Sequence, residues 1–291
     1  MILGKQPVKF MKRTNINLKI LLIVAIAFPF CFSSLAEQPT DRVEPEAQMP
    51  MADNKGTLVR GEKWLVATAN PHATEAGAAI LRAGGNAIDA MLAVQTTLGL
   101  TEPQSSGLGG GGFLLYWDQT QKKLTSFDAR ETAPAATSPT LLLDKEGKEL
   151  NFFDAVVSGI SVGVPGIPKL LDSAHKRYGT KPMADLTAHA INLAENGFII
   201  SPRLAGLIED RQDSLRRFET SRRFFFDEDG APLKSGTLLK NPAYADTLRS
   251  FTAHGADAIY KGPIATAMFD AVQNANTHKG RLSLHDLAGY Q

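Results

Sequence analysis

The chain has 291 residues, 43% of them hydrophobic, which is enough for one or two globular domains with a substantial core. Its 31 Lys and Arg residues nearly balance 30 Asp and Glu residues. The resulting net charge of +1 excludes the strongly basic surface of a typical nucleic-acid-binding protein, so we expect no nucleic-acid partner.

The N-terminus has the pattern of an export signal. Five basic residues and no acidic residue precede the apolar run Ile20–Phe28, and the small-residue site Ser33-Ser-Leu-Ala36 follows it. Because the apolar run is too short to span a bilayer, the pattern predicts a secretory signal peptide over residues 1–36, with an uncleaved anchor as the alternative. We therefore expect a periplasmic or secreted protein, without stable membrane insertion after cleavage.

Cleavage after Ala36 would change the chemistry of the chain. It would remove five of the 31 basic residues and none of the 30 acidic ones, leaving a net charge of −4. The single cysteine, Cys31, would leave as well. The mature chain would then have no disulfide and no cysteine nucleophile, which suits an oxidising compartment.

The next segments predict a leader, a strand and two helices. Residues 37–60 are polar and contain three prolines, as is typical of a mobile leader. A short strand is expected at Trp64–Ala69. Asn70 and Pro71 then open a helix that ends at Gly84-Gly85, and Asn86 caps the following helix.

Strands are expected early in the chain and helices later. Leu114–Trp117 and Leu124–Ala129 predict two antiparallel strands. Phe224–Gly230 predicts a small hairpin. Beyond Ser161 five helices are expected, at Ile167–Tyr178, Ala184–Asn196, Pro202–Arg217, Ala243–His254 and Ile264–Ala275. This order indicates an α+β fold rather than a regular βαβ alternation.

The segment Pro103–Phe113 reads P-Q-S-S-G-L-G-G-G-G-F, with five glycines in six residues. Glycine lets a ligand or another backbone approach closely, although a turn without chemistry is the alternative. The segment also satisfies G-x-G-x-x-G. A dinucleotide site needs a strand before the glycines and a helix after them, and here the predicted order is reversed.

Several short motifs in one order resemble the large-subunit half of the γ-glutamyltranspeptidase (glutathione hydrolase) family. The early ones are Asn70-Pro-His-Ala-Thr, Gly84-Gly-Asn-Ala-Ile-Asp-Ala90, Leu108-Gly-Gly-Gly-Gly-Phe113 and Asp128-Ala-Arg-Glu-Thr-Ala-Pro134. Later ones are Val164-Pro-Gly166, Lys176-Arg-Tyr-Gly179, Ala194-Glu-Asn-Gly-Phe198, Tyr260-Lys-Gly262 and Leu284-His-Asp-Leu-Ala-Gly-Tyr290. The resemblance covers residues 61–291.

The resemblance implies a fold, an activity and one site residue. The fold is the N-terminal nucleophile hydrolase type, an αββα sandwich of which this chain would hold only the N-terminal half. The activity is cleavage of the γ-glutamyl amide of glutathione and transfer of the acyl group to water, amino acids or peptides. Arg130 matches the family arginine that binds the α-carboxylate of the substrate, and a guanidinium offers a carboxylate a bidentate fork. A surface arginine paired with Asp128 or Glu131 is the alternative.

The family enzyme is made as a zymogen that cleaves itself, and the new N-terminal threonine of the small subunit is the nucleophile. No Thr-Thr-His-Tyr-like segment occurs in these 291 residues. We therefore expect a large-subunit part, truncated at its C-terminus, without the catalytic nucleophile and inactive by itself. Its expected partners are the C-terminal small subunit, glutathione and other γ-glutamyl compounds.

Other nucleophiles and metal sites have weaker support. Ser105 and Ser106 lack the G-x-S-x-G context of a serine nucleophile, and Thr74 and Thr132 fit capping or loop roles better. No two of the six histidines are three or four residues apart, so we expect no metal and no cofactor. The alternatives to the enzyme are a catalytically inactive secreted fragment or binding protein and a related acylase of the same family.

Overall fold

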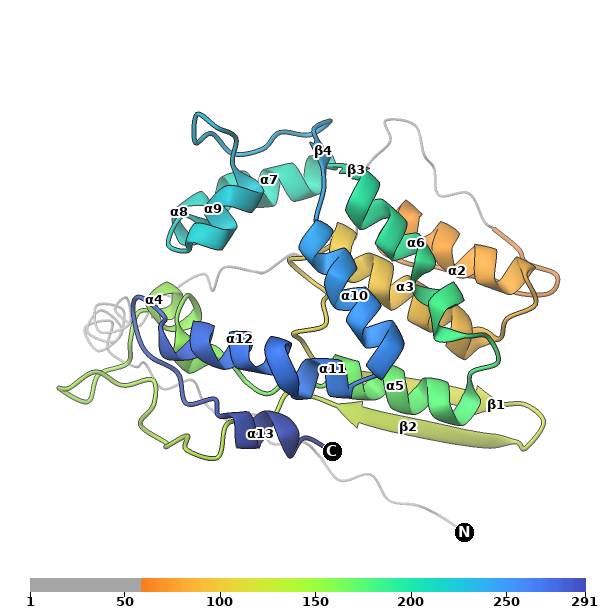
Figure 1. Cartoon of the computed structure of the whole chain (residues 1–291), viewed down its shortest axis with the longest axis horizontal. Helices are drawn as coiled ribbons and strands as arrows, with labels where there is room; N and C mark the ends of the chain where they lie inside the picture. Colours follow the sequence, from red (N-terminus) through yellow and green to blue (C-terminus); the bar gives the residue numbers. More distant parts are fainter. Residues whose placement is uncertain (1–58) are drawn as a thin grey trace, which may run out of the picture. The chain divides into compact units, whose positions relative to one another are not determined.

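A computed structural model describes residues 59–291 (Figure 1). The expected signal peptide and nearly all of the polar leader lie outside the described residues. Within residues 59–291 helices predominate over two short antiparallel sheets, which confirms the α+β class. None of the helices described there is long and apolar enough to cross a membrane.

The first two helices begin where the sequence predicts them. The Asn70 side chain accepts a hydrogen bond from the His72 N–H at the start of α2 (Pro71–Arg82). Asn86 and Asp89 form a reciprocal capping box at the start of α3 (Ala87–Thr101). Side-chain acceptors satisfy amide groups that have no partner inside a helix, which explains why both helices begin at these residues.

Four helices form the main helical layer (Figure 1). α2 packs on α3, α3 on α6 (Met183–Asn196), and α6 on α10 (Pro242–His254). Gly77 lies where α2 crosses α3, and a Cβ there would come within 2.7 Å of Val94 Cγ2. The absence of a side chain at Gly77 therefore allows the two helices to approach closely.

Strands β1 (Gly112–Asp118) and β2 (Lys123–Ala129) form an antiparallel ribbon, as predicted. Its inner face packs on α5 (Ile167–Tyr178), where the Tyr178 ring lies 4.6 Å from the Tyr116 ring and 6.3 Å from the Phe127 ring. Alternate β1 side chains point to the opposite face. On that face Phe113 and Leu115 are each 69% exposed.

All but the first two of the remaining elements add residues to three apolar clusters of the core. These remaining elements are α4 (Phe152–Val156), the 3-10 helix η2 (Gly159–Ser161), β3 (Phe198–Ile199), α7 (Pro202–Asp210), α8 (Gln212–Leu215), α9 (Glu219–Phe225), β4 (Leu238–Leu239), α11 (Asp257–Tyr260), α12 (Gly262–Gln273) and α13 (Leu284–Ala288).

Two predictions of secondary structure were wrong or incomplete. Trp64–Ala69 forms no strand, because no neighbouring strand of the described chain pairs with it, and Trp64 is 40% exposed. The single helix predicted at Pro202–Arg217 is broken at Arg211. α7 buries Leu204 and Ile208, whereas no residue of α8 is fully buried and only Leu215 packs against the core, so the second segment has fewer apolar contacts to hold it.

The predicted small hairpin at Phe224–Gly230 is only partly confirmed, because it begins later in the chain than expected. Phe224 and Phe225 belong to α9, which is stabilised by ion pairs of Glu219 with arginines three and four residues later. Only Phe226 forms a bridge, to Pro232, across a turn in which Gly230 has φ +79°. The predicted turn is therefore present, but it closes an isolated bridge.

Candidate functional site

The glycine-rich segment connects the end of α3 to the start of β1. This confirms the predicted order, helix before and strand after, which is the reverse of the order in a dinucleotide-binding turn. The carbonyl of Gly110 accepts hydrogen bonds from the N–H groups of Gly166 and Ile167, at 2.9 and 3.0 Å. The loop is thereby attached to the first turn of α5.

Two glycines are required by close backbone contacts at this junction. A Cβ on Gly166 would lie 1.9 Å from the carbonyl oxygen of Ala129. A Cβ on Gly111 would lie 2.5 Å from Glu131 Oε2 and 2.6 Å from the same carbonyl. These contacts bring the loop, α5 and the end of β2 together at one place.

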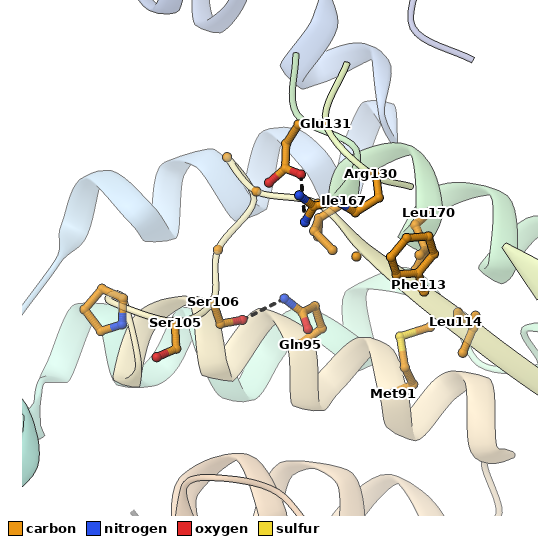
Figure 2. A pocket seen from close by; sticks show the side chains of 16 residues that line it. Met91, Gln95, Ser105, Ser106, Phe113, Leu114, Arg130, Glu131, Ile167 and Leu170 are labelled. Atoms are coloured by element: carbon orange, nitrogen blue, oxygen red, sulfur yellow. Dashed lines mark hydrogen bonds and ion pairs between the residues drawn. The ribbon is translucent and has the colours of Figure 1, made fainter. Parts of the chain in front are cut away.

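An open cavity of about 660 Å³ lies beside this junction (Figure 2). The glycine loop forms one wall, Gln95 of α3 lies below it, and Arg130 and Glu131 lie opposite. Ile167 and Leu170 of α5 contribute apolar surface. The cavity therefore combines an apolar wall, glycine backbone without side chains and one arginine that can bind an anion.

Arg130 follows the last residue of β2 and is fixed through its backbone. Its N–H donates to Asp128 Oδ1 at 3.0 Å, and its carbonyl accepts from the Tyr290 hydroxyl at 2.8 Å. The side chain is 60% exposed, and Nη1 lies 3.2 Å from Glu131 Oε2 (Figure 2). The expected alternative pairing with Glu131 is therefore present, and it leaves much of the guanidinium accessible to a ligand at the cavity.

The residues that hold Arg130 come from the C-terminal part of the described chain. The Tyr290 ring stacks on the Tyr260 ring at 5.7 Å, and the Tyr260 hydroxyl donates to the Pro165 carbonyl at 2.6 Å. Burial raises the pKa of Tyr290, and the carboxylates of Asp128 and Glu131 raise it further. The Tyr290 phenol thus remains protonated and can donate to the Arg130 carbonyl.

Within residues 59–291, no candidate hydroxyl nucleophile forms a hydrogen bond to a histidine or carboxylate side chain. Ser106 accepts a hydrogen bond from Gln95 Nε2 at 2.8 Å, and Ser105 is exposed at the cavity. Thr74 bonds to the Asn70 carbonyl at the start of α2, and Thr132 pairs with Val164 in an isolated bridge. No histidine lines this cavity, and residues 59–291 contain no cluster of three metal-ligating side chains.

A buried carboxylate at the base of the glycine loop was not anticipated from the sequence. Glu102, which caps the C-terminus of α3, is 1% exposed. It accepts hydrogen bonds from Asn70 at 2.9 Å and Gln104 at 2.6 Å, and it pairs with the buried guanidinium of Arg203. The sequence signal that could have identified it is an acidic residue directly after Leu100 and Thr101, the buried last residues of α3.

Comparisons with known proteins agree with the order of motifs. Residues 73–291 match the family model described as gamma-glutamyltranspeptidase. The chain is 39% identical over 282 residues to the glutathione hydrolase proenzyme of Bacillus subtilis, which covers 96% of this chain and 46% of that protein. It is 35% identical over 236 residues to the acylase ACY 1 proenzyme of a Pseudomonas strain, covering 79% of this chain and 41% of that protein.

The fold is also shared with solved structures. The gamma-glutamyltranspeptidase of Helicobacter pylori superimposes with a TM-score of 0.76 at 29% identity, over 81% of this chain and 66% of that chain. The likeness confirms the expected fold, part of an N-terminal nucleophile hydrolase. The chain spans about half the length of the curated relatives it matches.

Proposed function

Because this chain belongs to the gamma-glutamyltranspeptidase family, we propose that it is the large-subunit part of a γ-glutamyltransferase and glutathione hydrolase. The complete enzyme would cleave the γ-glutamyl amide of glutathione and transfer the acyl group to water, an amino acid or a peptide. The threonine nucleophile and the small subunit would come from sequence that matches the other half of the relatives.

In this proposal the part played by the chain is recognition of the substrate. Arg130 binds the α-carboxylate of the γ-glutamyl group, and the cavity between the glycine loop and α5 receives the rest of the amino-acid end. Holding that end fixes the γ-carbonyl relative to the nucleophile, which lowers the entropic part of the barrier. The bond that breaks is the γ-amide, and the displaced amine leaves before the acyl group is transferred.

One observation carries the proposal for Arg130. Its backbone is anchored on both sides, by Asp128 and Tyr290, while its side chain stays 60% exposed beside a cavity. An arginine that only neutralises a neighbouring charge needs no such anchoring. A fixed backbone with an accessible guanidinium is what bidentate binding of a carboxylate requires.

The test joins this chain to the C-terminal half of the Bacillus subtilis proenzyme, a protein called the fusion below. We expect the fusion to cleave itself and to hydrolyse a γ-glutamyl anilide, and the chain alone to do neither. Arg130→Ala in the fusion should leave self-cleavage intact while anilide hydrolysis falls. If the chain alone shows turnover that is lost on Arg130→Ala, this would contradict the proposal that the nucleophile comes from the other half.

A second candidate function is an acylase acting on another amide, which is favoured by the 35% identity to acylase ACY 1. Arg130 does not separate the two, since any acyl group that carries a carboxylate could use it. A second fusion with the C-terminal half of that acylase decides the matter. We compare self-cleavage and turnover in the two fusions. The C-terminal half that restores both is the one whose surface fits this chain.

We also propose that the protein is exported to the periplasm or secreted. The support is the N-terminal pattern of basic residues, a short apolar run and the Ser34-Leu-Ala36 site. Intact-mass analysis of exported protein should show an N-terminus at Glu37. A mature N-terminus at Met1 would contradict both the export proposal and the net charge derived from it.

A further inference from the structure

A second cavity, of about 380 Å³, shares no residue with the one beside Arg130. Its polar side chains come from two segments: Ser138 and Thr140 on the loop after β2, and Thr277, His278, Lys279 and Arg281 on the loop after α12. No acidic side chain lines it. The lining thus offers two permanent positive charges and three hydroxyl groups without any competing carboxylate, and one of the hydroxyls, that of Thr277, already donates to the Val157 carbonyl.

The cations of this second cavity have no partner within the described chain. Between residues 59 and 291, every arginine except Arg60 and Arg281 has an ion pair, a hydrogen bond or an aromatic ring as partner. Lys279 is also without an ion pair there, as are most lysines of the described chain, in which only Lys176 and Lys261 have one. Arg281 thus lines the cavity without a partner, and Lys279, which lines the same cavity, has no ion pair either.

The loop that carries the cations is held rigidly by backbone contacts. The Gly159 N–H donates to the His278 carbonyl at 2.8 Å, and the Gly280 N–H donates to the Val272 carbonyl at 3.0 Å. A Cβ on Gly280 would lie 2.1 Å from the Gly159 oxygen, so the two backbones are in direct contact. A rigid loop loses little conformational entropy when a ligand binds to it.

The opposite wall is also ordered, and it is partly apolar. Ser138 and Thr140 hydroxyls lie 3.2 Å apart in a turn closed by the Leu141 N–H, which donates to the Ser138 carbonyl at 3.1 Å. Leu141 and Ile160 line the same cavity. The volume exceeds what a bare inorganic anion would fill and lies within the range of small-molecule sites.

We propose that this second cavity binds a small organic oxyanion, a molecule that carries a phosphate group or two carboxylates on a compact apolar body. Lys279 and Arg281 would bind the oxyanion, with Ser138 and Thr140 as hydroxyl donors. Leu141 and Ile160 would contact the apolar body. The site is separate from the proposed γ-glutamyl site, since none of its lining residues borders the Arg130 cavity.

Titration calorimetry on the full chain at constant ionic strength tests this site. The probes are phenyl phosphate, phthalate, inorganic phosphate and the neutral benzyl alcohol. We expect phenyl phosphate or phthalate to bind more tightly than inorganic phosphate, because the apolar wall adds contact area, and benzyl alcohol not to bind. The better of the two organic anions identifies the oxyanion that the site prefers.

A matched pair of double variants separates a site from general charge attraction. Lys279→Gln/Arg281→Gln should weaken the organic anion at least about tenfold, since charge-assisted hydrogen bonds are lost. Lys234→Gln/Arg60→Gln removes the same charge elsewhere and should leave binding within about twofold. Circular dichroism checks that both variants fold like the parent chain. Equal weakening by the two double variants, or no binding of either organic anion, would overturn the proposal.

Discussion

Two Arg–Glu pairs lie on either side of the glycine loop, and they differ in burial. The side chains of Arg203 and Glu102 are 8% and 2% exposed, whereas those of Arg130 and Glu131 are 60% and 32% exposed. Glu102 has further donors in Asn70 and Gln104. Glu131 Oε2 accepts no hydrogen bond within residues 59–291.

The comparison separates a structural pair from a pair that can exchange partners. Glu102 connects the start of α2, the end of α3 and Arg203 near the start of α7, so its loss would affect three helix ends. Arg130 can turn to a ligand more easily, since its side chain is 60% exposed and only the Oε2 atom of Glu131 would lose an ion pair. Burial and the number of partners, rather than the residue types, therefore distinguish the two pairs.

The largest effect is expected from Glu102→Ala. Removing one partner of a buried pair leaves an uncompensated charge, so the free energy of unfolding should fall by about 3–5 kcal/mol. Urea denaturation of the chain, followed by circular dichroism, measures the change. Glu75→Ala breaks the exposed Glu75–Arg82 pair and serves as the control, with little change in the unfolding midpoint.

A double variant shows whether charge is the cause. Glu102→Leu/Arg203→Met removes both charges and should be more stable than Glu102→Ala. Recovery should be incomplete, because Asn70 and Gln104 lose their acceptor. If the Glu102→Ala chain is as stable as the parent, the buried Glu102–Arg203 pair does not stabilise the fold more than an exposed pair does.

Asp89 sharpens the comparison, because it is a buried carboxylate that is held without a cation. It is 0% exposed and accepts hydrogen bonds from the Asn86 and Thr180 N–H groups, each at 2.9 Å. Asp89→Asn should lower the free energy of unfolding by about 1.5–3 kcal/mol, since bonds to a charged acceptor are lost. Asp185→Asn, in the exposed first turn of α6, is the matched control.

The Asp89 effect should depend on pH. Burial opposes ionisation, but hydrogen bonds from Thr180, Asn86 and Lys181 outweigh it and hold the pKa of Asp89 below its usual value. A depressed folded-state pKa contributes stability above the unfolded pKa of about 3.9, and this is lost as pH falls through the folded value. The difference between parent and Asp89→Asn should therefore be constant above about pH 5 and shrink below about pH 4. A difference that grows in acid would contradict this assignment.

The pairs also show what could be predicted from the sequence. Local rules placed the caps at Asn70 and Asn86 and the β1–β2 ribbon, since these depend on residues close in the chain. The Glu102–Arg203 pair joins residues 101 positions apart, which no local pattern encodes. The family resemblance, rather than periodicity, singled out Arg130, whose role remains a prediction.

At the exposed pair, activity should change more than stability. Arg130→Lys in the fusion keeps the charge but loses the planar fork, so kcat/KM should fall about tenfold, mainly through KM. Self-cleavage and the unfolding midpoint should stay unchanged. Arg249→Lys, an exposed and ion-paired arginine on α10, is the matched control. Equal kcat/KM for Arg130→Lys, Arg130→Ala and the parent fusion would show that Arg130 does not bind the substrate.

The smallest effect is expected from Glu131→Gln, which keeps the size of the side chain and removes its charge. Because Glu131 Oε2 lies 3.2 Å from Arg130 Nη1, it competes with any incoming carboxylate for the guanidinium. Without that negative charge, glutarate should inhibit the fusion at a concentration about two- to threefold lower, as expected for a partly exposed charge. The free energy of unfolding should change by less than about 0.5 kcal/mol.

Glu209→Gln, an exposed acid on α7, removes the same charge at a distance and should leave inhibition by glutarate unchanged. The opposite result at Glu131 would be equally informative. If Glu131→Gln weakens glutarate as much as Arg130→Ala does, Glu131 orients the guanidinium rather than competing for it. The Arg130–Glu131 pair would then stay together when a ligand binds, as the buried Arg203–Glu102 pair does. Exposure of a pair would not by itself show that its arginine can exchange partners.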